Sequence, residues 1–287
     1  MKSKQNKILV PIDFSEQSLI ALKQSYNLAK IQDAEIVLLY VLEELNPVIK
    51  VFFSEVSGLK EAVEKNLKTL AEDSSKESGV PISYMLTKGS VYNKIVKTAK
   101  AIKAKMIVMG TQGAARGKFI GSNSLRVVKT SPCPVITIKG KKHQKGCKKI
   151  LLPLDLTKAT TDKVNIGIKL AKLFDAQINV ASIILSDKNE VLSKLEEQIN
   201  EVKEVIEKEN IKCETALIPI EKGKKKLVSA LLDYAEDIAA DLILIMTQQE
   251  NDFKELFIGS KAQAIINKSE IPVMSVLPQK KFEQKNK

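Results

Sequence analysis

The stretch that decides the fold is residues 8–13, with the sequence ILVPID, which recurs as ILLPLD at residues 150–155. A second stretch, LAKIQDAEI at residues 28–36, recurs as LAKLFDAQI at residues 170–178. Both pairs are offset by 142 residues. Two matches in the same order and at the same offset indicate an internal repeat.

Two further matches extend the repeat towards the end of the chain. FIGS occurs at residues 119–122 and again at residues 257–260. SPCPV at residues 131–135 resembles SEIPV at residues 269–273. A period near 140 residues is too long for a solenoid unit, so the sequence predicts duplication of a whole domain.

The segment between the two copies, GKKHQKG at residues 140–146, is polar and bounded by glycines, which is typical of a linker. We therefore assign residues 1–143 and 144–287 as two tandem domains. His143, the only histidine of the chain, falls in the linker. We therefore expect no Ser-His or metal-histidine site in either domain core.

Each copy alternates short apolar runs with longer stretches of helical periodicity. In the first copy we expect strands at residues 8–12, 36–41, 82–87, 106–109 and 135–138. Apolar runs without alternation are typical of strands buried on both faces of a parallel sheet. Ser15 is expected to cap the first helix, and a second helix is expected from Glu55 to Glu77, ending at Gly79. The fold class is therefore α/β: two tandem, doubly wound, five-stranded parallel-sheet domains.

Composition excludes several classes of protein. The longest purely apolar run, residues 36–42, is far shorter than the ~20 residues that span a bilayer, so we expect no membrane contact. Residues 1–7 have no apolar core of a secretory signal, which favours the cytoplasm. Cys133, Cys147 and Cys213 lie far apart, so neither a disulfide framework nor a zinc site is expected.

The net charge of +12 is concentrated in the first domain. Residues 1–143 contain 23 basic and 12 acidic residues, whereas residues 144–287 contain 23 and 22. The lysines are spread singly along the expected helices, and no nucleic-acid-binding motif accompanies them. We interpret the excess as a solvated basic surface and expect no sequence-specific nucleic-acid binding.

Ligands of open parallel sheets bind outside the carboxyl ends of the strands, where the strand order reverses. Two segments of the first copy meet this description, residues 11–15 and residues 110–122. Glycines in the second segment would let backbone amides approach an anion, and a helix beginning after Ser122 would favour negative charge. Alternatively, the glycines only form tight turns and Ser122 only caps the helix.

Two nucleotide-binding motifs are excluded. Residues 113–119, GAARGKF, have three residues between the glycines where a P-loop needs four, and Phe119 where it needs Ser or Thr. Residues 13–18 contain no glycine, so the dinucleotide fingerprint of a Rossmann domain is absent after the first strand.

The combination of Pro-x-Asp after the first strand, Gly-x-x-Gly after the fourth, then Gly-Ser and Ser-x-x-Pro-Val resembles the universal stress protein family, over nearly the whole chain and twice. The resemblance implies an adenine nucleotide α-hydrolase-like, Rossmann-like fold and an ATP site in the first domain. It implies that Asp13 and the backbone of Val41 hold adenine. It also implies that Gly110, Gly113, Gly121 and Ser122 hold ribose and phosphates, with Asn123 adjacent and Mg²⁺ as a companion of the phosphates. Seven residues separate Gly113 from Gly121 where the family pattern has nine.

The second copy departs further from that pattern. Met246 and Gln249 stand where Gly110 and Gly113 stand in the first copy, although Gly259-Ser260 is retained. Side chains at those two positions would occupy the space of phosphates. Asp155 and Ile183 correspond to Asp13 and Val41, so a remnant of an adenine site could persist there.

Three functions are compatible with these observations. The first is a cytoplasmic stress-response protein that binds ATP or another adenine nucleotide in its first domain and is not an enzyme. The second is a nucleotide-free interaction module that acts through protein partners. The third is an enzyme such as an ATP pyrophosphatase, but its expected Ser-Gly-Gly-x-Asp-Ser loop is absent after the first strand. The resemblance also implies an intramolecular pseudo-dimer through the last strands, residues 135–138 and 273–277, and further association as a homodimer.

Overall fold

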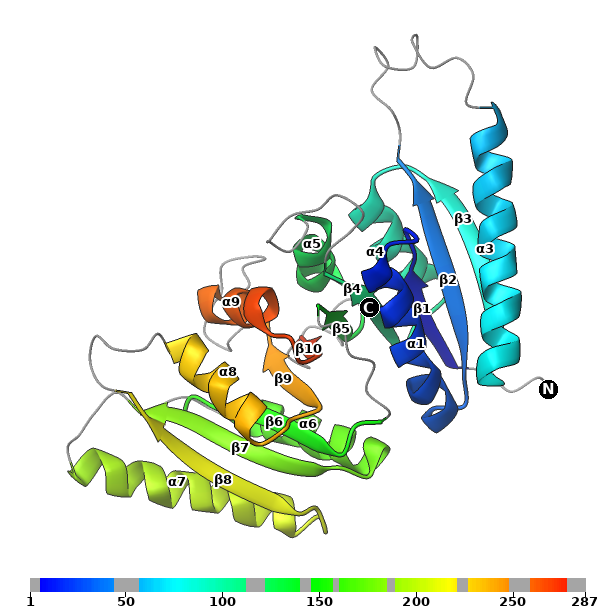
Figure 1. The fold of residues 1–287 in the computed structure, drawn as a ribbon. Coiled ribbons are helices and arrows are strands. Elements are labelled where there is room, and N and C mark those ends of the chain that lie inside the picture. The colour runs from blue at the N-terminus through cyan, green and yellow to red at the C-terminus, as the bar shows by residue number, and fades with distance from the viewer. Residues whose placement is uncertain are drawn as a thin grey trace, which may run out of the picture. The chain divides into compact units, whose positions relative to one another are not determined.

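The structure, a computed structural model, describes residues 6–43, 57–111, 122–139, 146–156, 160–184, 189–220, 227–247 and 259–277. The chain divides into two compact units, Met1–His143 (unit 1) and Gln144–Lys287 (unit 2), shown in Figure 1. Each unit is an alternation of strands and helices. We describe them separately.

Unit 1 contains five described strands with helices between them. The elements are β1 (Asn6–Pro11), α1 (Glu16–Ile31), β2 (Ala34–Leu42), α3 (Ser57–Ser78), β3 (Ile82–Lys88), α4 (Val91–Ala101), β4 (Met106–Gly110), α5 (Ser122–Thr130) and β5 (Val135–Ile138). The strand order is β3-β2-β1-β4-β5, and all neighbouring strands are parallel. The chain therefore builds the sheet outward from β1 in one direction, then returns to β4 on its other side.

Unit 2 repeats this architecture with its own sequence. Its elements are β6 (Lys149–Pro153), α6 (Thr161–Phe174), β7 (Gln177–Ile184), α7 (Asn189–Glu207), β8 (Cys213–Pro219), α8 (Leu227–Asp237), β9 (Leu242–Met246), α9 (Ser260–Lys268) and β10 (Val273–Val276). The order β8-β7-β6-β9-β10, again all parallel, matches unit 1 strand for strand. This agreement confirms the expected duplication of a doubly wound α/β domain.

The central strands form the core of each unit. Ile8, Leu9 and Val10 of β1 have no exposed surface, and Ile150 and Leu151 of β6 are equally buried. Burial of consecutive residues means that both faces of the strand are covered, as parallel sheets require. Right-handed crossovers place α1 and α3 on one face of the unit 1 sheet and α4 and α5 on the other. In line with this arrangement, α4 packs against α5.

The expected helix ends are also observed. Ser15 caps α1, because its hydroxyl accepts a hydrogen bond from the Ser18 amide at 3.3 Å. α3 ends at Ser78, and Gly79 follows it in a left-handed conformation with φ of +69°. The start expected at Glu55 lies outside the described residues. α5 begins at Ser122 rather than after it, so Ser122 is the first helical residue and not the cap.

Corresponding helices of the two units carry opposite charges. α4 has the sequence VYNKIVKTAKA, with three lysines and no acidic residue. α8, its counterpart in unit 2, has the sequence LVSALLDYAED, with three carboxylates and no basic residue. The fold has therefore been kept while the charge of this helix was inverted.

Candidate functional site

The switch point of unit 1 lies between β1 and β4, since the chain leaves β1 towards β2 and later returns to β4. The carboxyl ends of these strands lead to Asp13 and to Gly110, respectively. Two of the expected site residues therefore come from the neighbouring strands that flank the switch point. This is the position at which open α/β sheets bind ligands.

The turn after β1 is held by hydrogen bonds centred on Asp13. Its carboxylate Oδ1 accepts from the Ser15 amide at 3.0 Å and from the Ser15 hydroxyl at 2.5 Å. The Ser18 hydroxyl donates to the Ser15 carbonyl at 2.9 Å. Phe14, which lies between Asp13 and Ser15, has a φ of +59°, which is unusual for a bulky residue. The turn therefore fixes an exposed carboxylate at the edge of the sheet.

Asp13 and Val41 each lie two residues beyond a paired position of the β1–β2 ladder. The β1–β2 register pairs Pro11 with Leu39, and the Ile12 amide donates to the Leu39 carbonyl at 2.9 Å. From this register we expect Asp13 to lie near Val41, the two residues expected at an adenine base.

Close packing requires a glycine at position 110, and the sequence alone did not reveal this. A Cβ built on Gly110 would lie 2.9 Å from the Cβ of Gln17 and 3.0 Å from its carbonyl carbon. Such distances are too short for a real side chain, so the first turn of α1 can approach β4 only because residue 110 is a glycine. Gln17 is 8% exposed, and its Oε1 has no hydrogen-bond partner among the described residues.

The start of α5 is tied to the end of β4. The Ser124 hydroxyl donates to the Gly110 carbonyl at 3.3 Å. Ser122 is exposed and Asn123 is half-buried, both in the first turn of this nine-residue helix. Gly113 and Gly121 lie outside the described residues. The described part of the site is thus Asp13, Val41, Gly110, Ser122 and Asn123.

The corresponding region of unit 2 differs at the position of Gly110, the residue that packs on α1 in unit 1. Met246, the last residue of β9, replaces the glycine. α6 is capped at Thr160, whereas the 142-residue offset from Ser15 would place the cap at Thr157. A methionine side chain would collide with a helix turn placed as in unit 1, so the later start of α6 is consistent with Met246. Gln249 lies outside the described residues, and no described atom lies within 4 Å of a Cβ on Gly259.

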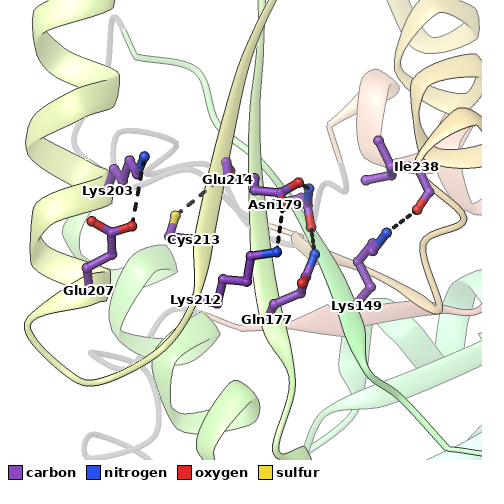
Figure 2. Close-up of polar contacts among 9 residues, drawn as sticks. All are labelled: Lys149, Gln177, Asn179, Lys203, Glu207, Lys212, Cys213, Glu214 and Ile238. Atoms are coloured by element: carbon purple, nitrogen blue, oxygen red, sulfur yellow. Dashed lines mark hydrogen bonds and ion pairs between the residues drawn. The ribbon is translucent and has the colours of Figure 1, made fainter.

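A polar cluster at the amino ends of the unit 2 strands was not expected from the sequence (Figure 2). Asn179, fully buried within β7, donates to Glu214 at 3.1 Å and accepts from Gln177 at 3.1 Å. The Lys212 ammonium lies 2.9 Å from the Glu214 carboxylate. Lys149 donates to the Ile238 carbonyl, just beyond α8, at 2.6 Å. Lys149, Gln177 and Glu214 lie at the amino ends of parallel strands, away from the switch point.

The polar groups of this cluster form hydrogen bonds and an ion pair with one another. Hydrogen bonds from Lys212 and Asn179 lower the pKa of the Glu214 carboxyl. In unit 1 the same strand ends carry a smaller set, in which Glu35 pairs with Lys7 at 3.6 Å and accepts from the Ser83 hydroxyl. We interpret both sets as polar contacts that stabilise the pairing of neighbouring strands. Asn179 is a single polar residue within the mostly apolar β7, so its pairing with Glu214 could not be predicted from the sequence.

The cysteines and acidic residues offer no metal centre within the described parts of the chain. No group of three or more His, Cys, Asp or Glu side chains there could hold a metal ion. Burial raises the pKa of the Cys133 thiol to about 11 and those of Cys147 and Cys213 to about 12. None of the described helices is long and apolar enough to cross a membrane.

Two doubly wound parallel-sheet domains in one chain, with a polar turn at the switch point of the first, define a tandem Rossmann-like α/β protein. Residues 5–139 and residues 146–276 each match the universal stress protein family, and the chain therefore belongs to that family. The expected resemblance is thereby confirmed in both halves of the chain.

Relatives and solved structures agree with this assignment. Universal stress protein MJ0531 of Methanocaldococcus jannaschii is 35% identical over 147 residues, covering 48% of this chain and 84% of that protein. Universal stress protein YxiE of Bacillus subtilis is 32% identical over 146 residues, covering 47% and 99%. The crystal structure of a universal stress protein from Archaeoglobus fulgidus DSM 4304 superposes with a TM-score of 0.72 at 20% identity, covering 96% of this chain and 97% of that one. This last likeness shows that the tandem fold spans the chain.

Proposed function

We propose that unit 1 binds an adenine nucleotide, ATP or a close relative, and that the chain is a nucleotide-responsive binding protein of the cytoplasmic stress response. The observation that supports the proposal is the turn after β1, where Ser15 holds the exposed Asp13 carboxylate next to the switch point. The assignment of the ligand follows from the family to which the chain belongs. The proposed role is binding, not catalysis.

The chemistry of this edge suits a purine base. The Asp13 carboxylate accepts hydrogen bonds, and the backbone of Val41 supplies both a donor and an acceptor where β2 ends. Adenine presents an exocyclic amino donor next to ring-nitrogen acceptors, so a carboxylate and a strand backbone together could satisfy it. The hydrogen bonds from Ser15 hold the carboxylate before any ligand arrives, which reduces the ordering cost of binding.

The phosphates would lie towards α5. Ser122 and Asn123 contribute first-turn amides, and the positive end of the helix dipole favours an anion there. In the proposal Gly110, Gly113 and Gly121 complete the ribose and phosphate contacts, and Mg²⁺ neutralises part of the phosphate charge. The proposal assigns no such site to unit 2, because Met246 fills the place of Gly110.

The test is calorimetric titration of the full chain with ATP and ADP, together with thermal unfolding. One site per chain is expected, and ATP at about 100 times its Kd should stabilise unit 1 by ~2.7 kcal/mol. Asp13→Ala should weaken binding, whereas the matched variant Asp155→Ala in unit 2 should leave the wild-type Kd. Two equivalent sites, or equal losses in both variants, would contradict the assignment to unit 1.

A second candidate, the nucleotide-free interaction module, is favoured by one observation. The contact between Gly110 and Gln17 gives this glycine a structural role, so its presence does not by itself require a phosphate. The opposite charges of α4 and α8 would suit charged protein partners. Titration of the wild-type chain decides between the two functions, since absence of heat with every adenine nucleotide would favour the module.

A further inference from the structure

An aromatic pair borders the site of unit 1. The ring centroids of Phe14 and Tyr40 lie 5.5 Å apart, with the ring planes tilted by 37°. Phe14 directly follows Asp13, and Tyr40 directly precedes Val41. Both residues are half-buried. β1 and β2, which lead to these residues, lie side by side in Figure 1.

The turn itself does not require a ring at position 14. With φ of +59°, Phe14 occupies the left-handed region, which glycine and asparagine adopt more readily. The Ser15 hydrogen bonds to Asp13 span this residue and hold the turn on either side of it. Phe14 is therefore a bulky aromatic residue in a backbone conformation that glycine or asparagine adopts at lower cost.

Unit 2 shows that the fold does not need the pair. At the 142-residue offset, Leu156 stands in the place of Phe14 and Ser182 in the place of Tyr40. These residues are only 5% and 4% exposed, so unit 2 has two buried, non-aromatic side chains at the corresponding positions. The aromatic pair thus distinguishes the two units independently of the glycines.

We propose that the Phe14–Tyr40 pair is a specificity-determining surface of unit 1, which packs against the aromatic base of the bound nucleotide. This inference rests on the proposed function. Aromatic faces bind bases by stacking and by burying apolar area, whereas Asp13 and the Val41 backbone supply only hydrogen bonds. The pair therefore selects ligands that carry a planar ring, and it does so at the end of the site remote from the phosphates.

Intrinsic tyrosine emission gives a direct readout, because the chain has five tyrosines and no tryptophan. The full chain is titrated with ATP while emission and heat are recorded in parallel. In the wild type, stacking of adenine on Tyr40 should quench part of the emission. Tyr40→Phe keeps a ring, so it should bind ATP within about twofold of the wild-type Kd and lose most of the quenching.

The residues of unit 2 provide matched replacements. Phe14→Leu and Tyr40→Ser, which introduce the side chains of Leu156 and Ser182, should each weaken ATP binding by about tenfold, within the range of base-stacking losses. Tyr234→Phe in unit 2 should change neither the Kd nor the quenching. Urea unfolding without nucleotide verifies that each variant folds, and Tyr40→Phe retains the test if Tyr40→Ser does not.

The outcomes separate the two proposals. If the wild-type chain binds no adenine nucleotide, the proposed function fails and this inference fails with it. If the wild type binds ATP but quenching persists in Tyr40→Phe, the base does not stack on this ring and only the inference fails. Wild-type affinity in folded Phe14→Leu and Tyr40→Ser would likewise overturn the inference and leave the proposed function standing.

Discussion

Gly110 at the end of β4 lies against Gln17 in the first turn of α1, so closely that a Cβ on the glycine would be 3.0 Å from the Gln17 carbonyl carbon. This contact predicts that Gly110→Ala destabilises unit 1 by roughly 1–3 kcal/mol even without nucleotide, because the helix must move away from the strand. Gly58→Ala is the control, since no described atom lies within 4 Å of its Cβ, and it should be neutral or stabilising. Urea unfolding measures both. Equal stability of Gly110→Ala and wild type would contradict the packing argument.

Loss of the α1 cap should have a local effect. Ser15→Ala removes the acceptor of the Ser18 amide and a donor to Asp13, and should cost unit 1 about 1 kcal/mol. Thr160→Ala is the matched change at the cap of α6, where the side chain makes no cap hydrogen bond, so its cost should be smaller. Hydrogen exchange resolved by unit measures each loss. A larger cost for Thr160→Ala would show that the cap of α1 is not the stronger one.

The salt-bridged Glu214 should make unit 2 sensitive to acid. Its pKa is lowered from 4.5 by hydrogen bonds from Lys212 and Asn179, so the folded state holds the proton less tightly than the unfolded state. The stabilisation from the ionised carboxylate is therefore present above about pH 4.5 and is lost as pH falls through the lowered folded value. The stability difference between wild type and Glu214→Gln should be constant near neutral pH and vanish in acid. A difference that persists unchanged at about pH 2 would exclude this cause.

The thiols should be almost unreactive in the folded chain. Burial raises the pKa of Cys133 to about 11, and the pKa of Cys147 to about 12, with the nearby Asp241 carboxylate as a second cause. At about pH 8 the thiolate fraction of Cys133 is then on the order of one in a thousand, and that of Cys147 smaller still. Reaction with a disulfide reagent should be slow in buffer and fast in urea. Rapid modification of one thiol in buffer would show that its surroundings open without global unfolding.

The expected pseudo-dimer has its own test. If β5 and β10 pair as the family resemblance implies, their outward-facing amides should exchange slowly in the full chain. Isolated residues 1–143 should bury the same edge by self-association instead, because an exposed strand edge seeks a partner. Hydrogen exchange of residues 135–138 and sedimentation of the isolated half give the two measurements. Fast exchange in the full chain would contradict the pairing.

The sequence predicted the fold well, since the fold depends on features that are local or repeated. Apolar runs such as residues 8–12 are buried on both faces of the sheet. Ser15 caps the start of α1 through its hydroxyl, and Gly79 ends α3 because glycine adopts the left-handed conformation readily. The expected strands differ from the observed ones by at most two residues at their ends, as at β2, expected over 36–41 and observed as Ala34–Leu42.

The site was less predictable because it depends on which segments meet in space. The close packing of Gly110 against Gln17, 93 positions earlier in the chain, was not predicted from the sequence. The pairing of Asn179 with Glu214 depends on the register of β7 and β8, which no spacing in the sequence reveals. Phe14 and Tyr40 meet for the same reason, through the register of β1 and β2.

The inverted charge of one helix gives the two units different local electrostatics. Lys94, Lys97 and Lys100 of α4 attract anions from a distance, whereas Asp233, Glu236 and Asp237 of α8 repel them. If unit 1 binds a nucleotide as proposed, this difference should steer the diffusing anion towards unit 1 rather than unit 2. This preference is kinetic, so added salt should slow capture by unit 1 far more than it alters the release rate. A difference in surface charge of this kind would make two domains of the same fold unequal in how often an anion reaches them.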